Sequence, residues 1–357
     1  MYRYLYIDDE GKDTSEALAS GLSSENVTVE YQHVSIFNTE FIKKNLDNYD
    51  GIVLDLRLDD TANSSNFTAT EFAQHIRTLV TKGDLNKDLP IVLFSTDDKL
   101  EQVYATDLSS HNLFDSYYSK TETETHANAS EEMFALAQGY IEIANNKNNL
   151  SKLMGLEDLY DLNAEIFARF DIENSNIPIH EYAQVILKDL IYVTGTLIDE
   201  SVLASRLGVD IESKNWQEVK KLFDLAKYQG VFSNGWDRWW MFKVNEIFKG
   251  EFNTYLSYLN AEEKCQLFVD RKHISNITSP EPIKFNSSNR YTTVCKVLNR
   301  PLDAIEGYRV YTTKPLKQWQ EYSYVSLYAF AEKLNEEQKI AVHPEDRDSL
   351  HDALSNL

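Results

Sequence analysis

Short apolar runs alternate with amphipathic stretches over the first 145 residues of the chain. Each run is rich in β-branched and aromatic residues and stops at a polar residue, which is typical of a strand that ends in a turn. The runs GIVLDL and IVLFS are largely apolar at consecutive positions, as are strands covered on both faces. We therefore predict five strands, at Tyr2–Ile7, Val27–Val34, Gly51–Leu56, the IVLFS run that follows Pro90, and Phe114–Ser119.

Helical periodicity separates these predicted strands. Phe72, Ile76, Leu79 and Val80 recur at the spacing of one helix face, and Glu131–Ala144 forms a closing amphipathic helix. Strands that alternate with helices of this length predict a parallel sheet with helices on both faces. The predicted class is therefore α/β, with a five-stranded parallel-sheet domain over residues 1–145 and a polar linker over 146–155.

Residues 156–260 predict a mostly helical domain. The pattern gives helices and then a hairpin with Asn234-Gly235 at its tip, at Leu156–Phe170, Glu181–Val193, Asp199–Val209, Asn215–Leu225 and Tyr228–Trp240. Helix, turn, helix and hairpin follow the order of a winged helix. The supposed recognition segment, residues 213–227, is close to neutral, which disfavours DNA as its partner. The same pattern also serves as a protein-interaction or dimerisation module.

The remaining residues, 261–357, predict an α+β region. Its strand-like runs are Tyr291–Val297 and Gly307–Thr313, and its helices are Tyr322–Leu334 and His343–Leu357.

Three tryptophans lie within five residues, at Trp236, Trp239 and Trp240. They could form a ligand box or an interface, but core packing is the favoured interpretation.

Charge narrows the function classes. The 357 residues include 35 basic and 57 acidic side chains, for a formal charge of −22. This balance disfavours nucleic acid, because phosphate contacts require Lys and Arg. The sequence shows neither a secretory signal pattern nor an apolar run long enough for a membrane span, and its two cysteines, Cys265 and Cys295, suit a reducing compartment. We expect a cytoplasmic protein without a membrane partner.

The charge is unevenly spread along the chain. Residues 1–150 hold 11 basic and 26 acidic residues, whereas residues 264–320 hold 10 basic and 4 acidic ones with tyrosines interleaved. Solvated surface accounts for many such asymmetries. A basic and aromatic surface can also hold single-stranded nucleic acid or an acidic protein face, and intramolecular or kinase docking is the simpler of these interpretations.

Polar side chains follow the predicted strands at one edge of the sheet. Asp8 and Asp9 follow the first strand, Asp55 lies near the end of the third, Ser95 ends the fourth and Lys120 follows the fifth. Sites on parallel sheets lie at the carboxyl ends of the strands. Three neighbouring carboxylates need a cation, and their hard oxygen ligands suit Mg²⁺. A lysine and a hydroxyl beside that metal provide partners for phosphoryl oxygens.

With these residues in this order, the N-terminal region resembles the flavodoxin-like receiver domain of bacterial response regulators. The resemblance implies that Asp8, Asp9 and Asp55 hold Mg²⁺, with Asp55 in IVLDLRL as the phosphoacceptor. Ser95 in PIVLFST and Lys120 in YYSKT then match the family's hydroxyl and lysine. Tyr117, three places before the lysine, matches the aromatic residue that changes rotamer on activation. The backbone carbonyl of Arg57 would be the remaining protein ligand to the metal.

Two departures from the family pattern predict a long-lived phosphoryl group. The residue after Ser95 is usually tiny but is Thr96 here, and Arg57 is long enough to reach over the site. Both side chains are expected to shield the phosphoryl group from water. A long polar stretch, Asp59–Thr70, also replaces the usual short loop. The alternative is that these features are drift in a degenerate receiver.

The resemblance implies a phosphorelay protein that accepts a phosphoryl group on Asp55 from a histidine kinase or phosphotransfer partner. It would be a phosphoacceptor rather than a conventional enzyme. Its output would be a changed protein contact or the storage of phosphoryl groups, and an arrangement of this kind is similar to phosphorelays of anti-phage defence. A homodimer is also compatible with this organisation. The alternatives are a phosphorylation-controlled DNA-binding regulator and a pseudo-receiver scaffold.

The C-terminal half shows no further catalytic motif. It has no Gly-rich phosphate loop, nucleophile elbow or Cys/His set with metal-binding spacing. Its isolated histidines, His180 and His273, are interpreted as structural.

Overall fold

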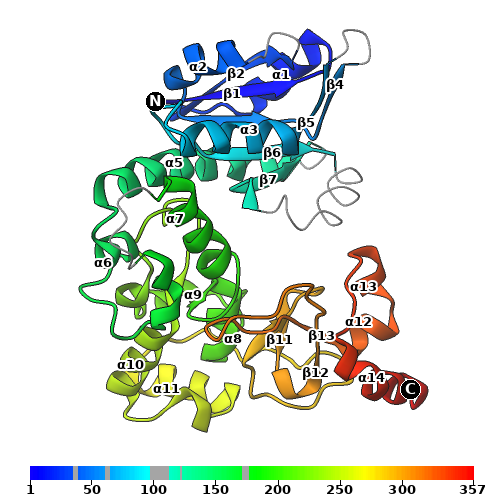
Figure 1. Cartoon of the computed structure of the whole chain (residues 1–357). Coiled ribbons are helices and arrows are strands. Elements are labelled where there is room, and N and C mark those ends of the chain that lie inside the picture. The colour runs from blue at the N-terminus through cyan, green and yellow to red at the C-terminus, as the bar shows by residue number, and fades with distance from the viewer. Residues whose placement is uncertain (35–38, 61–64, 97–111, 121–122, 171–176) are drawn as a thin grey trace. The chain divides into compact units, whose positions relative to one another are not determined.

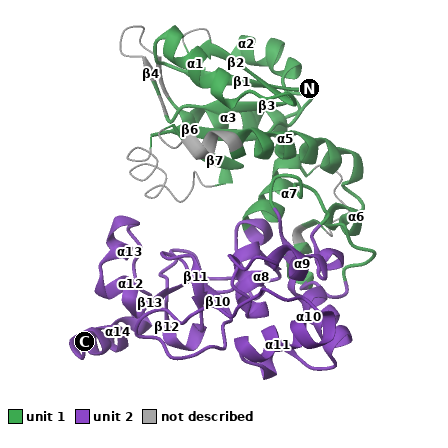
Figure 2. Ribbon diagram, turned by 180° about the vertical axis from the view of Figure 1, so that it is seen from behind, with its two compact units in different colours: residues 1–159, 164–188, 229–236 green, residues 160–163, 189–228, 237–357 purple. Residues whose placement is uncertain are grey.

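The computed structural model describes residues 1–34, 39–60, 65–96, 112–120, 123–170 and 177–357. Two compact units divide the chain (Figure 2). The first comprises residues 1–159, 164–188 and 229–236, and the second comprises residues 160–163, 189–228 and 237–357. The predicted domain limits at residues 145, 155 and 260 stay predictions, because this division concerns compactness and not independent folding.

A five-stranded parallel sheet forms the centre of the first unit (Figure 1). Its strand order is β2-β1-β3-β6-β7, and each neighbouring pair is parallel. This confirms the predicted parallel sheet, with small changes at the strand ends. The strands are β1 (Tyr2–Asp8), β2 (Val27–His33), β3 (Gly51–Leu54), β6 (Ile91–Ser95) and β7 (Ser116–Ser119).

Helices cover both faces of this sheet because alternate strand residues point to opposite sides. Leu5 of β1 belongs to a buried cluster with Ile76 of α3, whereas Tyr4 donates a hydrogen bond from its hydroxyl to the Met133 carbonyl of α5 at 2.6 Å. In β1, Leu5 therefore faces the layer of α3, and Tyr4 faces the layer of α5. The helices are α1 (Lys12–Leu22), α2 (Thr39–Asn45), the 3₁₀ turn η2 (Leu46–Asn48), α3 (Ala69–Thr81) and α5 (Thr123–Asn146).

The polar stretch Asp59–Thr70 is more regular than its composition predicts. Strands β4 (Arg57–Asp60) and β5 (Ser65–Thr68) pair antiparallel, with Leu58 opposite Phe67. Thr68 then caps α3: its hydroxyl accepts the Glu71 N–H, and the Glu71 carboxylate accepts the Thr68 N–H. This reciprocal cap fixes the start of α3 directly after β5.

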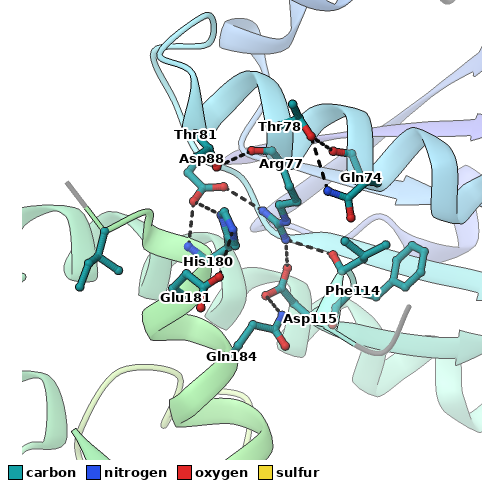
Figure 3. Close-up of polar contacts among 12 residues, drawn as sticks. Gln74, Arg77, Thr78, Thr81, Asp88, Phe114, Asp115, His180, Glu181 and Gln184 are labelled. Atoms are coloured by element: carbon teal, nitrogen blue, oxygen red, sulfur yellow. Dashed lines mark hydrogen bonds and ion pairs between the residues drawn. The ribbon is translucent and has the colours of Figure 1, made fainter. Parts of the chain in front are cut away.

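A buried network of charged side chains lies at the amino end of β6 (Figure 3). Arg77 of α3 donates to Asp88 Oδ1 at 2.8 Å and to Asp115 Oδ2 at 2.9 Å. Asp115 also accepts the Ile91 N–H at 2.8 Å and the Tyr140 hydroxyl of α5 at 2.8 Å. A buried arginine thus has two carboxylate partners, which in turn hold a strand and a helix.

The same network holds α7 (Ile179–Ile186) against the sheet. Asp88 Oδ2 accepts the backbone N–H of His180 at 2.8 Å and lies 2.7 Å from its Nδ1. Gln184, one turn further along α7, donates to Asp115 Oδ1 at 3.4 Å. His180 is 6% exposed, in agreement with the structural role predicted for it. The buried charges therefore attach α7 to the first unit.

Residues 229–236, which belong to the first unit, pack against α5. A Cβ built on Gly139 would lie 2.2 Å from the Phe232 ring, and Asn234 donates to Gln138 Oε1 at 2.9 Å. Only a glycine allows this close approach.

The predicted helix over 156–170 is wrong. After α6 (Leu150–Met154), the described residues up to 170 form only the 3₁₀ turns η5 (Ala164–Ile166) and η6 (Ala168–Phe170).

The helical part of the second unit contains two very short strands. β8 (Leu197–Ile198) pairs antiparallel with β9 (Trp239–Trp240), and an isolated bridge joins Lys227 to Trp239. The predicted hairpin over 228–240 is therefore a turn over 231–235 with minimal strand pairing. Trp239 and Trp240 are buried, as the core interpretation predicted, whereas Trp236 is half-buried. The π turn η7 (Leu187–Ile191) spans the boundary between the two units. The helices of the second unit that follow are α8 (Glu200–Leu207), α9 (Trp216–Lys221), η8 (Asp224–Ala226), α10 (Met241–Phe252), η9 (Leu256–Tyr258) and α11 (Ala261–Lys272).

A small mixed sheet with the order β11-β10-β13-β12 follows. β10 and β13 are parallel, and the other two pairs are antiparallel. The predicted helix over 322–334 is wrong at its start, where β13 precedes α12. The elements are β10 (Thr293–Cys295), β11 (Arg300–Leu302), η10 (Ala304–Glu306), β12 (Gly307–Arg309), β13 (Tyr324–Ser326), α12 (Leu327–Ala331), α13 (Leu334–Glu337), η11 (Pro344–Asp346) and α14 (Arg347–Ser355).

Among the described residues, no helix combines the length and apolar character needed to cross a membrane.

Candidate functional site

The carboxyl ends of β1, β3, β6 and β7 bring the predicted site residues to one edge of the sheet. β1 ends at Asp8, Asp55 follows β3, β6 ends at Ser95 and Lys120 follows β7. Two backbone hydrogen bonds continue the strand pairing: the Asp55 N–H donates to Ile7 O at 3.0 Å, and the Lys120 N–H donates to Ser95 O at 2.8 Å. Backbone pairing therefore positions Asp55 and Lys120 beside the neighbouring strands, in addition to their side-chain contacts.

Lys120 joins two of the aspartates. Its Nζ lies 2.8 Å from Asp8 Oδ2 and 2.8 Å from Asp55 Oδ1, and 3.7 Å from Glu10 Oε1. The lysine side chain is only 7% exposed. Although burial lowers the pKa of Lys120, Asp55 and Asp8 outweigh that effect and raise it above the usual value. The ammonium group is therefore a fixed positive charge beside Asp55.

Three carboxylates converge at this edge. Ligand oxygens of Asp8, Asp9 and Asp55 all lie within 4.8 Å of one another. Asp8 and Asp55 are buried, and Asp9 is half-buried. Burial, together with the charges of Asp8 and Asp55, raises the pKa of Asp9 to about 6. Burial also acts to raise the pKa of Asp8, but Lys120 outweighs it and the pKa lies below its usual value.

Tyr6 is a site residue that the sequence analysis missed. Its hydroxyl donates to Asp8 Oδ2, while the Glu10 N–H donates to Asp8 Oδ1 at 3.0 Å. Its ring and the Phe94 ring each lie 5.9 Å from Lys120 Nζ. Because side chains alternate between the two faces of a strand, Tyr6 and Asp8 lie on the same face of β1. This spacing in the sequence could have identified Tyr6 as a neighbour of Asp8.

Ser95 lies beside Lys120 and is fully buried. Its hydroxyl has no hydrogen-bond partner within the part of the chain that the structure describes. A buried hydroxyl without a partner is costly unless a ligand supplies one. The Ser95 hydroxyl is therefore an available donor and acceptor at the end of β6, where the Ser95 carbonyl pairs with the Lys120 N–H.

The other predicted residues differ in their placement. Thr96 is half-buried directly after Ser95. Tyr117 lies on β7 with 58% of its surface exposed, so its ring does not fill the interior. Arg57 begins β4, but its side chain lies outside the described residues. The structure thus brings together Asp8, Asp9, Asp55 and Lys120, with Ser95 next to them in the sheet.

The donor set at this edge fits a hard divalent cation. Carboxylate oxygens are ligands that Mg²⁺ prefers, and it binds through one or two of them while keeping several waters. Lys120 offsets only one of the three negative charges if all three aspartates are ionised. Burial is the larger cause of the raised pKa of Asp9, and the negative charges of Asp8 and Asp55 add to it. A cation at the triad would offset the contribution of these two charges.

Comparisons with known proteins give fold-level similarity only. Neither a family model nor a curated protein matches the chain. Among solved structures, one titled "A novel family of redox sensors in the streptococci evolved from two-component response regulators" is similar at 19% identity and a TM-score of 0.30, covering 41% of this chain and 55% of the other. A RitR mutant is similar at 20% identity and a TM-score of 0.30, covering 40% and 55%.

A third solved structure, the response regulator ChrA of a heme-sensing two-component system, is similar at 15% identity and a TM-score of 0.26. The match covers 52% of this chain and 98% of ChrA. This chain spans about half the length of the first two structures. The sheet order β2-β1-β3-β6-β7, with its acidic triad and its lysine, is typical of a receiver domain, and the first unit is receiver-like on these features.

Proposed function

We propose that this protein is a phosphorelay receiver that accepts a phosphoryl group on Asp55 from a histidine kinase or phosphotransfer partner. The observation that carries the proposal is the environment of Asp55. Its buried carboxylate is held 2.8 Å from Lys120 Nζ, within reach of the Asp8 and Asp9 oxygens. A carboxylate fixed between a cation and a potential metal site is equipped to receive a phosphoryl group.

The transfer forms one bond and breaks another. An Asp55 carboxylate oxygen forms an O–P bond as the P–N bond to the donor imidazole breaks, and the departing imidazole keeps the electron pair and takes a proton. Mg²⁺, when bound through Asp8, Asp9 and Asp55, would supply positive charge for the phosphoryl oxygens. Lys120 supplies a second positive charge without moving far, because it already contacts Asp55.

Ser95 and Thr96 provide the remaining polar contacts in this proposal. The unpartnered Ser95 hydroxyl donates to a phosphoryl oxygen, which removes the cost of its burial. Thr96 and Arg57 restrict the approach of the attacking water and so prolong the aspartyl phosphate. Tyr117, now exposed, is the residue whose rotamer responds to the change at Ser95.

Incubation of the full chain with Mg²⁺ and acetyl phosphate, followed by intact-mass measurement, tests this proposal. We expect the mass of one phosphoryl group to be added, and we expect EDTA to prevent it. Asp55→Asn must abolish the gain, whereas Asp84→Asn, at an exposed ion pair with Lys43, must leave it intact. A protein that gains no mass and whose thermal midpoint is unchanged by beryllofluoride would be a pseudo-receiver scaffold.

Two outputs fit a receiver whose second unit has no recognised catalytic motif. Phosphorylation either changes a protein contact or removes phosphoryl groups from a shared kinase. Competition between this chain and a second receiver for one phosphorylated kinase separates them, since a sink lowers labelling of the competitor. A role in anti-phage defence stays a prediction from the resemblance.

DNA binding under phosphorylation control is the second candidate, and one observation favours it. The elements α7, β8, α8, α9 and β9 follow the order of a winged helix, with β9 between β8 and the Lys227 bridge. The exposed side of α9 presents Gln217, Glu218 and Lys221, which together carry no net charge. Binding to duplex DNA with a steep salt dependence would support this candidate, and no binding at low salt would exclude it.

A further inference from the structure

A cavity of about 580 Å³ lies within the second unit, remote in sequence from the receiver residues. Small-molecule sites span roughly 300–1,000 Å³, so the volume suits a ligand of nucleotide size. Its walls come from α8, α10, α11 and the segments that flank η9, β10 and η10. The basic and aromatic stretch 264–320 contributes Lys264 and Arg290, together with Tyr291 and Thr292.

Lys264 gives the cavity a buried positive charge. The residue is 3% exposed, and its Nζ donates to the Arg206 carbonyl at 2.9 Å. In the described part of the chain no carboxylate lies within ion-pair distance of it. A buried ammonium group without a carboxylate is costly, and a single carbonyl uses one of its three donors.

Arg290 adds a second charge at the same cavity. Its Nη1 lies 3.5 Å from the Ser257 carbonyl and 3.3 Å from the Tyr258 carbonyl, and no carboxylate among the described residues pairs with it. Arg206, by contrast, has its own ion-pair partner in Glu321. Two of the three lining cations are therefore not neutralised by a salt bridge.

Asp303 is the only acidic side chain among the lining residues, and it is already occupied. Its Oδ1 accepts the Ile305 N–H at 3.0 Å, and its Oδ2 accepts the Ser288 hydroxyl at 2.5 Å. These contacts fix the loop rather than a cation. The cavity consequently keeps a positive balance.

Apolar and aromatic side chains form the rest of the wall. Leu256 and Tyr291 are buried, Met241 and Leu259 are partly buried, and Tyr255 is 44% exposed. The Tyr291 hydroxyl donates to the Pro280 carbonyl at 2.9 Å, so the ring is oriented by a partner outside the cavity. Such walls suit a flat apolar body with one charged group.

We propose that this cavity binds a small organic anion, whose phosphate or carboxylate group lies at Lys264 and Arg290 and whose aromatic body packs between Tyr255 and Leu256. This site goes beyond the phosphoacceptor at Asp55 and would give the second unit a ligand of its own. The ammonium group of Lys264, which has no carboxylate partner among the described residues, supports the proposal. Burial and Arg290 lower the pKa of Lys264 to about 8, and the negative charge of a bound anion would raise it again.

Isothermal titration calorimetry of the full chain tests the site with four compounds. AMP and indole-3-acetate carry an anion on an aromatic body as phosphate and carboxylate, whereas adenosine lacks the charge and inorganic phosphate lacks the ring. We expect at least one of the two aromatic anions to bind, and to bind about tenfold more tightly than adenosine or phosphate. Whether AMP or indole-3-acetate binds shows whether the site prefers a phosphate or a carboxylate.

Three variants locate the binding. Lys264→Met keeps the length of the side chain without the charge, and Arg290→Ala removes the second cation. Each is expected to weaken the aromatic anion about tenfold, while Arg271→Ala, at an exposed position of α11, leaves binding unchanged. If Lys264→Met does not fold, the affinity of Arg290→Ala for the aromatic anion alone decides whether the anion binds in this cavity. Absence of binding by both aromatic anions, or equal affinity in all variants, would overturn the proposal.

Discussion

Asp88 holds His180 through a single carboxylate oxygen that receives both the backbone N–H and the ring Nδ1 of the histidine, at 2.8 Å and 2.7 Å. Its other oxygen accepts from Arg77 at 2.8 Å. One buried aspartate therefore joins α7 to α3 (Figure 3). The stability of the first unit should depend strongly on this residue.

Asp88→Asn is expected to destabilise the first unit by about 3–5 kcal/mol, because it removes one of the two carboxylates that compensate the buried Arg77 charge. Urea unfolding measures the loss. Asp84→Asn is the matched control, because Asp84 pairs with Lys43 where both side chains are about 40% exposed, and we expect a cost below about 1 kcal/mol. Equal losses in the two variants would show that Arg77 does not depend on Asp88.

Gly139→Ala is expected to displace residues 229–236 from α5, because the new Cβ would overlap the Phe232 ring at 2.2 Å. Overpacking of this kind costs about 1–3 kcal/mol. Gly250→Ala, in α10, meets no atom within 4 Å and should instead stabilise its helix by about 0.5–1 kcal/mol. Hydrogen exchange at residues 229–236 should rise in Gly139→Ala alone. Unchanged protection there would contradict this contact.

The raised pKa of Asp9 predicts that its contribution to the stability of the folded protein falls as pH rises. Its pKa is about 6 in the folded protein and about 3.9 in an unfolded chain, so the folded state binds the proton more tightly. Its contribution to stability is therefore fully present below about pH 4 and lost as pH rises through about 6. Asp9→Asn removes this dependence, so its stability relative to wild type should increase over that interval. Urea unfolding in EDTA across the interval is the measurement, and parallel curves would refute the shift.

The proposed shielding of Asp55 by Thr96 and Arg57 predicts a slow loss of the phosphoryl group. On this proposal, the double variant Thr96→Ala with Arg57→Asn is expected to shorten the aspartyl-phosphate lifetime about tenfold, which corresponds to about 1.4 kcal/mol in the barrier. Decay of the phosphorylated mass over time gives the lifetime. Thr81→Ala, at an exposed position of α3, should leave it unchanged. The same lifetime in all three proteins would mean that neither side chain shields the site.

The sheet and its acidic edge could be predicted because each depends on local pattern. Runs such as GIVLDL indicate strands by themselves, and parallel order then places Asp8, Asp55 and Lys120 at one edge. The network around Arg77 was not predicted, because its partners Asp88 and Asp115 are separated along the chain and look like ordinary surface residues in the sequence. Burial of such charges depends on tertiary partners, which pattern alone does not show.

The sequence patterns also failed to predict very short elements and contacts between residues far apart along the chain. β8 and β9 have two residues each, which is too few for a periodic pattern. The predicted helix over 322–334 overlooked Ser326, whose hydroxyl accepts the Ala329 N–H and marks the start of α12 after a strand. The contact of Phe232 with Gly139 joins residues far apart in sequence, so no local signal could reveal it.

The chain leaves the first unit at residue 188 and returns to it at residues 229–236. During synthesis, domains generally fold in order from the N-terminus. The strands of the receiver-like sheet are complete at Ser119 and α5 ends at Asn146, yet the segment that covers Gly139 begins only at residue 229, more than eighty residues after the end of α5. Residues 229–236 therefore cannot cover the surface of α5 around Gly139 until well after the sheet and α5 have been synthesised.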